Sequence, residues 1–245
     1  MRSPFAWALI ELPNAKALAF WNADFVYSLS VRSEVQPKRG GGLRGAFHMM
    51  GNALHAVEHI RRESGREVLP VPVAFGAILK RHRQPAPVDV PGKRAHILDD
   101  IAWRAAERGL VLTGPPVHPF RSLHGLRLCL AVDDPAQRAA LALRLADAAW
   151  VHGRDLQDPE VVIHTATACG LDAAWARACL DDPAVKQALV VVTDQAADDG
   201  VFGVPTFELA GQLFWGTDRI PHLLAAAAGE SPGSVLARRR GSGSQ

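Results

Sequence analysis

The sequence predicts an α/β fold in which a strand–helix–strand unit and a strand–strand–helix unit enclose a long helical segment. Aromatic and β-branched residues mark strands near both ends of the chain, at 17–27 and 201–216. From about 92 to 199, alanine is dense and period-two alternation is absent, which favours helices. Hydrophobic residues make up 48% of the 245 residues and charged residues 21%, which is typical of a globular protein with a buried core.

The strand–helix–strand unit follows from the first 80 residues. After the strand at 17–27, the glycine-rich and basic segment 31–52 is predicted to be a mobile loop. A helix is predicted over 53–63, where apolar residues recur at close to helical spacing. A strand at 67–73 follows, and its two prolines favour a short strand or an edge position. A short helical turn is then predicted at 75–80.

The central segment predicts several helices in succession. In the first, Ile97, Ile101 and Ala105 lie on one face. Asp134 and Pro135 open a long alanine-rich helix that ends near Gly153, because proline suits the first helical turn. Two or three shorter helices are predicted between Asp158 and Asp199.

The last elements are two short strands, 207–209 and 213–215, joined by a tight turn, and a helix from about Thr217 through the alanines 225–228. The element order is that of a thioredoxin-like βαβ…ββα fold with a large all-helical insertion. Neither end has enough strands to close a core alone, which favours one shared sheet. The predicted parts are an N-terminal half (1–80), a helical insertion (81–199), a C-terminal ββα half (200–230) and a disordered tail (231–245).

Composition narrows the possible functions. The net charge is only +2, and no basic stripe interleaved with aromatic residues suggests nucleic acid. No apolar run is long enough for a membrane span, and Glu11, Pro13 and Asn14 interrupt the run that a secretory signal would need. A cytoplasmic location is therefore expected.

Cysteine and histidine spacing gives little support to a redox or metal centre. The three cysteines (Cys129, Cys169 and Cys179) form no C-x-x-C pair, which disfavours a dithiol centre and a cysteine-based zinc site. His48, His55 and His59 were considered as metal ligands, since His55 and His59 have an i, i+4 spacing. No carboxylate is placed as a third ligand, so no metal site is predicted.

The segment 200–220 carries the most information about function. Pro205 stands directly before a strand, between Val204 and Thr206, where a thioredoxin-like fold places a cis-proline. Such a bond leaves the N–H and C=O of Val204 free to pair with an extended peptide such as glutathione. The alternative is an ordinary proline at the start of a strand.

A second motif, Gly216-Thr217-Asp218-Arg219, lies at a strand-to-helix turn. Thr217 is expected to be an N-cap, and amides at a helix N-terminus attract carboxylates. Asp218 could hold the ammonium group of a γ-glutamyl moiety. The alternative is plain helix capping, with Asp218 interacting favourably with the helix dipole.

The stretch VFGVPTF…LFWGTDRI resembles the 2-hydroxychromene-2-carboxylate isomerase family, within the DsbA-like, kappa-class glutathione transferase superfamily. The segments PVAFGAILKRHRQPAP (72–87) and HPFRSLHGLRL (118–128) agree with it. The resemblance covers roughly residues 67–229 well and the first 66 poorly.

This resemblance implies a glutathione-dependent isomerase that interconverts 2-hydroxychromene-2-carboxylate and trans-o-hydroxybenzylidenepyruvate in aromatic catabolism. Glutathione is the implied cofactor, and its thiolate adds to the substrate, permits a bond rotation and leaves. Glutathione-binding positions are then Val204, Pro205, Gly216, Thr217, Asp218 and Arg219. Substrate-binding positions are Lys80, Lys93, Arg94 and Phe120. A small aromatic carboxylate and a possible homodimer complete the expected partners.

The N-terminal half departs from the family pattern. The family's first strand ends in a motif like D-F-x-S-P-Y-S, whereas this chain has Asp24-Phe25-Val26-Tyr27-Ser28. Ser28 matches the second, non-catalytic serine of that motif, and Ser30 lies close by, so these two serines are the catalytic candidates. A serine–proline–aromatic run at Ser3 is a weaker candidate, because no strand precedes it.

Three readings therefore remain open from sequence. The first is the isomerase. The second is a kappa-like glutathione transferase that acts on electrophiles. The third is a degenerate, non-catalytic thioredoxin-fold protein, motivated by the altered serine–proline motif. A disulfide oxidoreductase is the poorest enzyme option, because the chain has no C-x-x-C.

Overall fold

A four-stranded sheet joins the two ends of the chain. The structure is a computed structural model, and it describes residues 16–21, 51–107 and 111–234. The strand order is β2-β1-β3-β4; β1 and β2 are parallel, and β3 is antiparallel to both β1 and β4. The strands are β1 (Lys16–Trp21), β2 (Glu67–Pro72), β3 (Thr206–Leu209) and β4 (Gln212–Trp215).

The register brings together residues almost two hundred positions apart. Leu18 of β1 pairs with Leu69 on one side and with Glu208 on the other. β2 lies at an edge of the sheet, as its two prolines predict, because proline cannot donate a ladder hydrogen bond. The predicted strand is confirmed up to Trp21, and its continuation to residue 27 lies outside the described residues.

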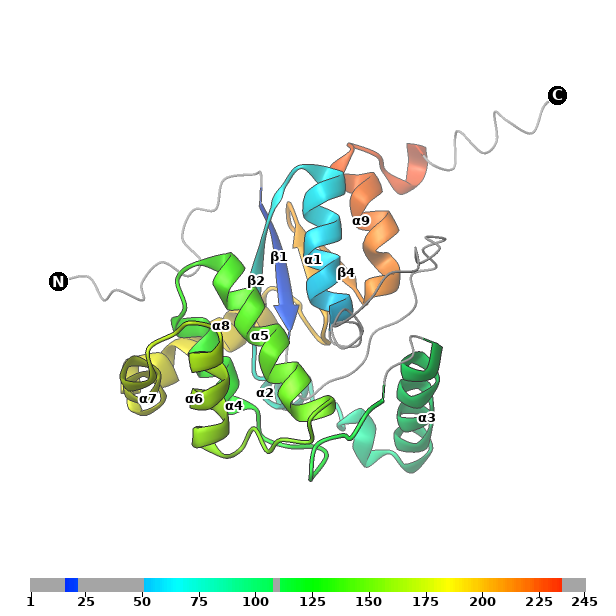
Figure 1. Ribbon diagram of the computed structural model, residues 1–245. Helices are drawn as coiled ribbons and strands as arrows, with labels where there is room; N and C mark the ends of the chain where they lie inside the picture. Colours follow the sequence, from blue (N-terminus) through cyan, green and yellow to red (C-terminus); the bar gives the residue numbers. More distant parts are fainter. Residues whose placement is uncertain (1–15, 22–50, 108–110, 235–245) are drawn as a thin grey trace, which may run out of the picture.

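Two helices lie side by side on one face of the sheet (Figure 1). α1 (Gly51–Ser64) buries Val57 and Ile60 there, and its predicted position is confirmed. α9 (Ile220–Ala227) begins three residues later than predicted, after a 3-10 turn, η3 (Thr217–Arg219). Proline fits only the first turn of an α-helix, and Pro221 therefore places the start of α9.

The remaining helices lie between residues 75 and 198, and the predicted helical character of this stretch is confirmed. In Figure 1, α4 to α8 gather at the lower left beside the sheet, and α3 stands apart at the lower right. The elements are α2 (Phe75–Arg81), η2 (Pro87–Asp89), α3 (Pro91–Glu107), α4 (Leu123–Ala131), α5 (Pro135–Trp150), α6 (Pro159–Ala168), α7 (Ala173–Asp181) and α8 (Pro183–Asp198).

An aspartate opens each of the helices α5 to α8. The carboxylates of Asp134, Asp158, Asp172 and Asp182 accept hydrogen bonds from amides in the first turn of the helix that follows. In three of the four helices a proline comes next, at a position that lacks an intrahelical partner in any case. The helix starts in this region are thus encoded locally.

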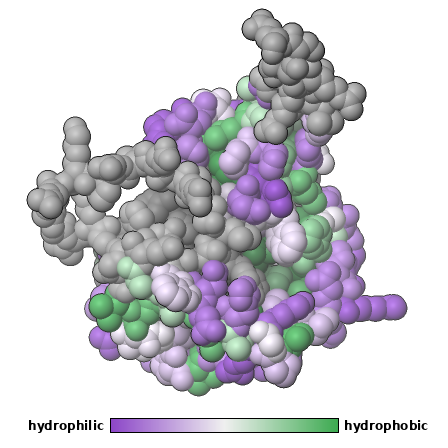
Figure 2. All heavy atoms as spheres, turned by 90° about the vertical axis from the view of Figure 1, so that its right-hand side faces the viewer, coloured by the Kyte–Doolittle hydropathy of each residue, from purple (hydrophilic) through white to green (hydrophobic). Residues whose placement is uncertain are grey.

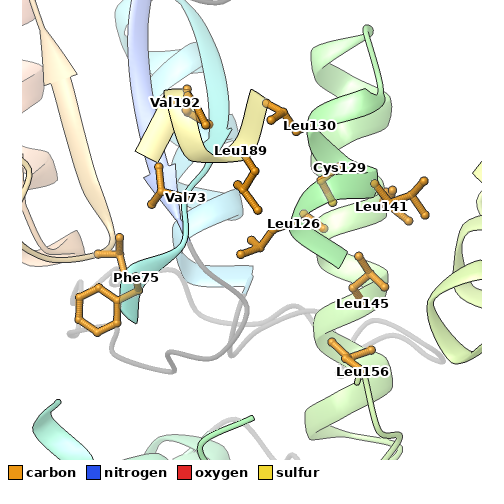
Figure 3. Packing of buried hydrophobic residues seen from close by; sticks show 14 of the residues in the cluster. Val73, Phe75, Leu126, Cys129, Leu130, Leu141, Leu145, Leu156, Leu189 and Val192 are labelled. Atoms are coloured by element: carbon orange, nitrogen blue, oxygen red, sulfur yellow. The ribbon is translucent and has the colours of Figure 1, made fainter. Parts of the chain in front are cut away.

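Helices and sheet share one hydrophobic core. Leu126 of α4 lies near Leu189 of α8 in Figure 3, and Leu141 and Leu145 of α5 belong to the same buried cluster; each of the four is at most 3% exposed. Val73, which directly follows β2, is fully buried in the same cluster. The helical layer is therefore packed against the end of a sheet strand.

A buried arginine also joins α5 to the sheet. Arg138 is only 4% exposed. Its Nε and one terminal nitrogen donate to the carbonyl oxygen of Val132, at 3.0 and 2.8 Å, and the other terminal nitrogen donates to that of Pro70 in β2 at 3.1 Å. Such bonds compensate the cost of burying a guanidinium.

The surface carries hydrophilic and hydrophobic residues in small interspersed groups over the coloured part of the face in Figure 2. Among the described helices, none has the length and apolar character needed to cross a bilayer. The predicted tail begins within the described part, where residues 231–234 make local hydrogen bonds between Ser231 and Ser234. Residues 235–245 lie outside it.

Candidate functional site

The peptide bond between Val204 and Pro205 is cis, directly before β3. The prediction of a cis-proline here is confirmed. Val204 is 3% exposed, and its N–H and C=O make no hydrogen bond within the described part of the chain. Since buried backbone groups are nearly always paired, Val204 is poised to receive a hydrogen-bonding partner.

Hydrogen bonds on both sides hold this segment in place. The Thr206 hydroxyl donates to the carbonyl oxygen of Gly203 at 2.6 Å. The Gly216 amide donates to the carbonyl oxygen of Pro205 at 2.9 Å. The second bond ties the end of β4 to the cis-proline, so the two predicted glutathione motifs meet in one place, although Pro205 and Gly216 are eleven positions apart around a hairpin.

The turn after β4 differs from the predicted capping arrangement. Gly216, not Thr217, is the N-cap of η3. Its φ is 91°, a backbone conformation that residues other than glycine rarely adopt. Thr217 is buried, at 1% exposed, and is the first residue of η3, whereas Arg219 is the N-cap of α9. The prediction of Thr217 as N-cap is wrong, because the chain enters a 3-10 turn before the α-helix begins.

Asp218 and Arg219 lie at the surface of this turn. A carboxylate oxygen of Asp218 is 3.3 Å from a terminal nitrogen of Arg219, and the two side chains are 29% and 54% exposed. Asp218 is therefore accessible to a cation of a ligand, in competition with its own neighbour. At an exposed pair that competition is weak.

The end of α2 is anchored to the loop that leads into the cis-proline. The His82 Nε2–H donates to the carbonyl oxygen of Val201 at 2.9 Å. Arg81 forms an ion pair with Asp198 at the end of α8. Lys80, in the last turn of α2, is exposed and makes no ion pair with any described residue. The structure thus brings the helix end that carries Lys80 to the loop before Val204.

The other predicted substrate positions lie elsewhere in the helical region. Lys93 and Arg94 are exposed in the first turn of α3, a helix that packs against η2. Arg94 donates to the carbonyl oxygen of His118 at 3.4 Å. Phe120 is 5% exposed and belongs to the hydrophobic core, which favours a packing role for its ring.

Several predicted residues lie outside the described part of the chain. These are Ser28 and Ser30, the catalytic candidates, and also Ser3 and His48; the side chain of His55 is likewise not described. His59 is described, and its ring lies 3.1 Å from a terminal nitrogen of Arg62. No cluster of potential metal ligands occurs among the described residues.

The cysteines lie outside the segments that form this site. Cys129 is on α4, Cys169 follows α6, and Cys179 is on α7. Burial raises the pKa of all three thiols, most strongly that of the fully buried Cys129. A thiol with a raised pKa is a poor nucleophile, which disfavours thiol exchange by these cysteines.

An aromatic pair beside the cis-proline was not predicted as a site. The rings of Phe202 and Trp215 meet edge to face, with centroids 5.0 Å apart, and the residues are 39% and 55% exposed. The contact between Phe202 and Trp215 joins a loop to an edge strand, and no periodicity in the sequence predicts it.

A small depression lies between α2, α4 and α8, with about 160 Å³ of space. Its walls are mostly apolar, with Arg127 and Lys186 from α4 and α8 among the lining residues. It is not lined by Val204, Pro205 or the η3 turn. None of the predicted glutathione-binding or substrate-binding residues faces it.

The sheet order, the helices α1 and α9 on one face and the cis-proline before β3 define a thioredoxin-fold protein with a helical insertion, as the sequence predicts. The segment 52–228 matches the family model described as the DSBA-like thioredoxin domain. The chain therefore belongs to the DsbA-like thioredoxin family. No curated protein sequence matches the chain at a significant level.

Two of the solved structures that are similar to this chain illustrate the likeness. One is a 2-hydroxychromene-2-carboxylate isomerase, with a TM-score of 0.67 and 18% identity, covering 94% of this chain and 100% of the other. The second is described as a probable DsbA oxidoreductase from Streptomyces coelicolor, with a TM-score of 0.59, 17% identity, and 88% and 91% coverage. At these identities the likeness shows the fold.

Proposed function

We propose that this protein binds glutathione along Val204 and catalyses the isomerisation of 2-hydroxychromene-2-carboxylate. The observation that carries the proposal is the cis bond at Val204–Pro205, with the backbone N–H and C=O of Val204 unbonded in the described part of the chain. An extended tripeptide can pair with these two groups as a short added strand. Similarity to an isomerase of this name adds support.

The turn after β4 would hold the other end of the tripeptide. The Gly216 amide bonds to the carbonyl oxygen of Pro205, so this turn lies next to the added strand. We assign the Asp218 carboxylate to the γ-glutamyl ammonium group, because it is accessible and its other cationic partner is an exposed arginine. A hydrogen bond to a charged group contributes about 1.5–3 kcal/mol.

The reaction needs a nucleophile and a site for the substrate carboxylate. Opening of the hemiketal ring breaks the bond between C2 and the ring oxygen, moves the proton of the C2 hydroxyl to the phenolic oxygen, and gives a ketone conjugated with a cis double bond. Bound glutathione would supply a thiolate that adds to that double bond, so that rotation about the resulting single bond becomes possible. The thiolate then leaves as the double bond re-forms in the trans geometry. Lys80 would hold the carboxylate as a point charge, because its ammonium group is exposed and free of described acidic partners. Ser28 or Ser30 remains the proposed donor that favours the thiolate.

Calorimetric titration of the reduced protein with glutathione tests the binding step. We expect binding at micromolar to low millimolar strength, and an Asp218→Asn variant should bind several-fold more weakly because it loses a charge-assisted bond. Glu160→Gln is the matched control, since Glu160 is another exposed carboxylate paired with an arginine, Arg177 on α7. Equal affinity in the Asp218 variant would remove that residue from the site.

The chemical step is tested with 2-hydroxychromene-2-carboxylate, followed by its change in absorbance with and without glutathione. Lys80→Ala should raise KM with a smaller effect on kcat, since a charge contact made in both ground and transition states contributes uniform binding. Lys186→Ala serves as its control. Glutathione binding without isomerisation would contradict the isomerase proposal and favour a glutathione transferase that conjugates an aromatic electrophile.

A further inference from the structure

Phe202 and Trp215 form an exposed aromatic surface next to the cis-proline. Their centroids are 5.0 Å apart with an interplanar angle of 64°, which is the edge-to-face arrangement that aromatic rings prefer. Trp215 remains 55% exposed and Phe202 39% exposed. Here two exposed aromatic side chains lie in contact, and contiguous apolar patches, unlike single exposed residues, mark binding surfaces.

The position of Trp215 is set by the sheet register and by a glycine. Trp215 of β4 lies opposite Thr206 of β3 in the register. Thr206 directly follows Pro205, so Trp215 lies close to the cis-proline. Its indole Nε1 would lie only 2.5 Å from a Cβ placed on Gly203. The indole therefore packs directly on the Gly203 backbone, one residue before Val204, and any larger residue at 203 would displace it.

Contacts on both sides set the place of Phe202, whose ring meets that of Trp215 edge to face. Phe202 precedes Val204 by two, and the carbonyl of Val201 before it is held by His82. The aromatic surface thus lies beside the backbone groups to which glutathione is assigned, and is fixed from both ends.

We propose that the Phe202–Trp215 pair binds the aromatic ring of a substrate that is joined to the glutathione sulfur. This inference rests on the proposed glutathione site. The occupant is an aromatic group joined to the glutathione sulfur, because the surface is apolar, aromatic and continuous with the segment 203–205. An aromatic ring gains from edge-to-face contact in addition to burial of its own area.

The test compares two stable ligands that differ only in the group on sulfur, S-benzylglutathione and S-methylglutathione. Calorimetry on the wild-type protein should show the benzyl ligand bound about tenfold more tightly than the methyl ligand. In Trp215→Ala that preference should fall to about twofold, while affinity for S-methylglutathione stays within about twofold of wild type. Phe202→Ala should give an intermediate preference.

Trp103→Ala is the matched control, because Trp103 on α3 is also an exposed tryptophan, at 72%, and should keep the full preference. Trp215→Phe retains an aromatic ring and should keep part of the preference even if the alanine variant does not fold. Circular dichroism and thermal midpoints confirm folding. An unchanged benzyl preference in every folded Trp215 and Phe202 variant would overturn the inference.

The outcomes separate this inference from the proposal on which it rests. Equal binding of both ligands to the wild-type protein leaves the glutathione site in place and overturns the aromatic assignment. Absence of binding by either ligand to the folded wild-type protein overturns the glutathione site, and the aromatic assignment falls with it. Loss of both affinities in Trp215→Ala, with folding intact, shows that the tryptophan shapes the glutathione site and does not bind the ring.

Discussion

The helical region and the C-terminal hairpin reach their structures by different means. In α5 to α8, each helix begins at an aspartate whose carboxylate bonds the first turn, and three of these aspartates precede a proline. The hairpin β3–β4 instead depends on pairing with β1, about 190 residues earlier in the chain, and on the cis bond at Pro205. One region is encoded locally, and the other depends on distant partners.

The candidate site lies in the region whose structure depends on distant partners. The candidate site combines the loop before β3, the turn after β4 and the end of α2, and the contacts that assemble it run between segments far apart in sequence. In that turn Gly216 has φ = 91° and no side chain caps η3, although Thr217 and Asp218 are residue types that favour a helix start. Sites supported by distant contacts can be tested by disturbing those contacts.

The largest effect is expected from truncating a core side chain in each region. Phe207→Ala in β3 and Leu145→Ala in α5 remove fully buried side chains, and each should lower the free energy of unfolding by about 3–5 kcal/mol. Urea denaturation followed by circular dichroism and by tryptophan fluorescence measures this. Coincident transitions would indicate one cooperative core, as the shared cluster suggests. Separate transitions would mean that the two regions unfold independently.

The second largest effect is expected from removing Arg138, which links α5 of the helical region to β2 of the sheet. Arg138→Met removes a buried guanidinium that bonds both Val132 and Pro70, and leaves two buried carbonyl groups without these donors. We expect a loss of about 2–4 kcal/mol in the free energy of unfolding. The control is Arg177→Met, because Arg177 is exposed and paired only at the surface, where a pair contributes about 0–1 kcal/mol. Similar losses in both variants would contradict a special role for Arg138.

The third effect is a pH dependence that originates in the helical region. Burial raises the pKa of Asp147, on α5, from 3.8 to about 6, although Arg144 and His152 partly oppose this. Below about pH 4 the carboxyl is protonated in both folded and unfolded states. Between about pH 4 and 6 only the folded state keeps the proton, so this group lowers stability as pH rises through that window.

Asp147→Asn should therefore flatten the pH dependence of stability. At pH 8 the variant should be more stable than wild type by about 1–2 kcal/mol, which is less than the full shift implies because relaxation and solvent reduce it. At pH 4 the two proteins should match within error. Denaturation curves at both pH values measure this, and a variant less stable than wild type at pH 8 would show that the carboxylate has a favourable partner.

The smallest effect is expected from removing a capping aspartate at a helix start. Asp182 opens α8 and accepts a hydrogen bond from the Ala184 amide at 2.7 Å. Asp182→Ala should cost about 1 kcal/mol, whereas Asp99→Ala, at an exposed position within α3, should change stability by less than about 0.5 kcal/mol. Thermal unfolding resolves the difference. Equal effects would indicate that capping contributes little to the start of α8.

Prediction from sequence succeeded where short-range signals existed. Asp134 with Pro135 located the start of α5, and the apolar spacing around Val57 and Ile60 located α1, because these signals act within one or two turns. The prolines of β2 placed it at an edge for a steric reason that needs no knowledge of its neighbours. The cis-proline was expected from Val204-Pro205-Thr206, and the structure confirms it.

Prediction was incomplete where geometry depends on other segments. Thr217 was expected to cap a helix by its residue type, but the 3-10 turn buries it. Phe120 was assigned to substrate from a resemblance, and in the structure it is a core residue. The packing of Trp215 on Gly203 and the bond from His82 to Val201 have no signature in spacing, because the loop and strand meet only after folding.

The sequence by itself determined the order of strands and helices, the start of α5, the edge position of β2 and the lack of a neighbouring cysteine pair. These properties depend on backbone stereochemistry and on contacts within a few residues. The tertiary structure decided which side chains share a surface: Val204 without a backbone partner in the described chain, Asp218 at an exposed turn, and Phe202 against Trp215. That selection depends on pairing across long stretches of chain, since burial of distant side chains supplies the free energy that brings those segments together.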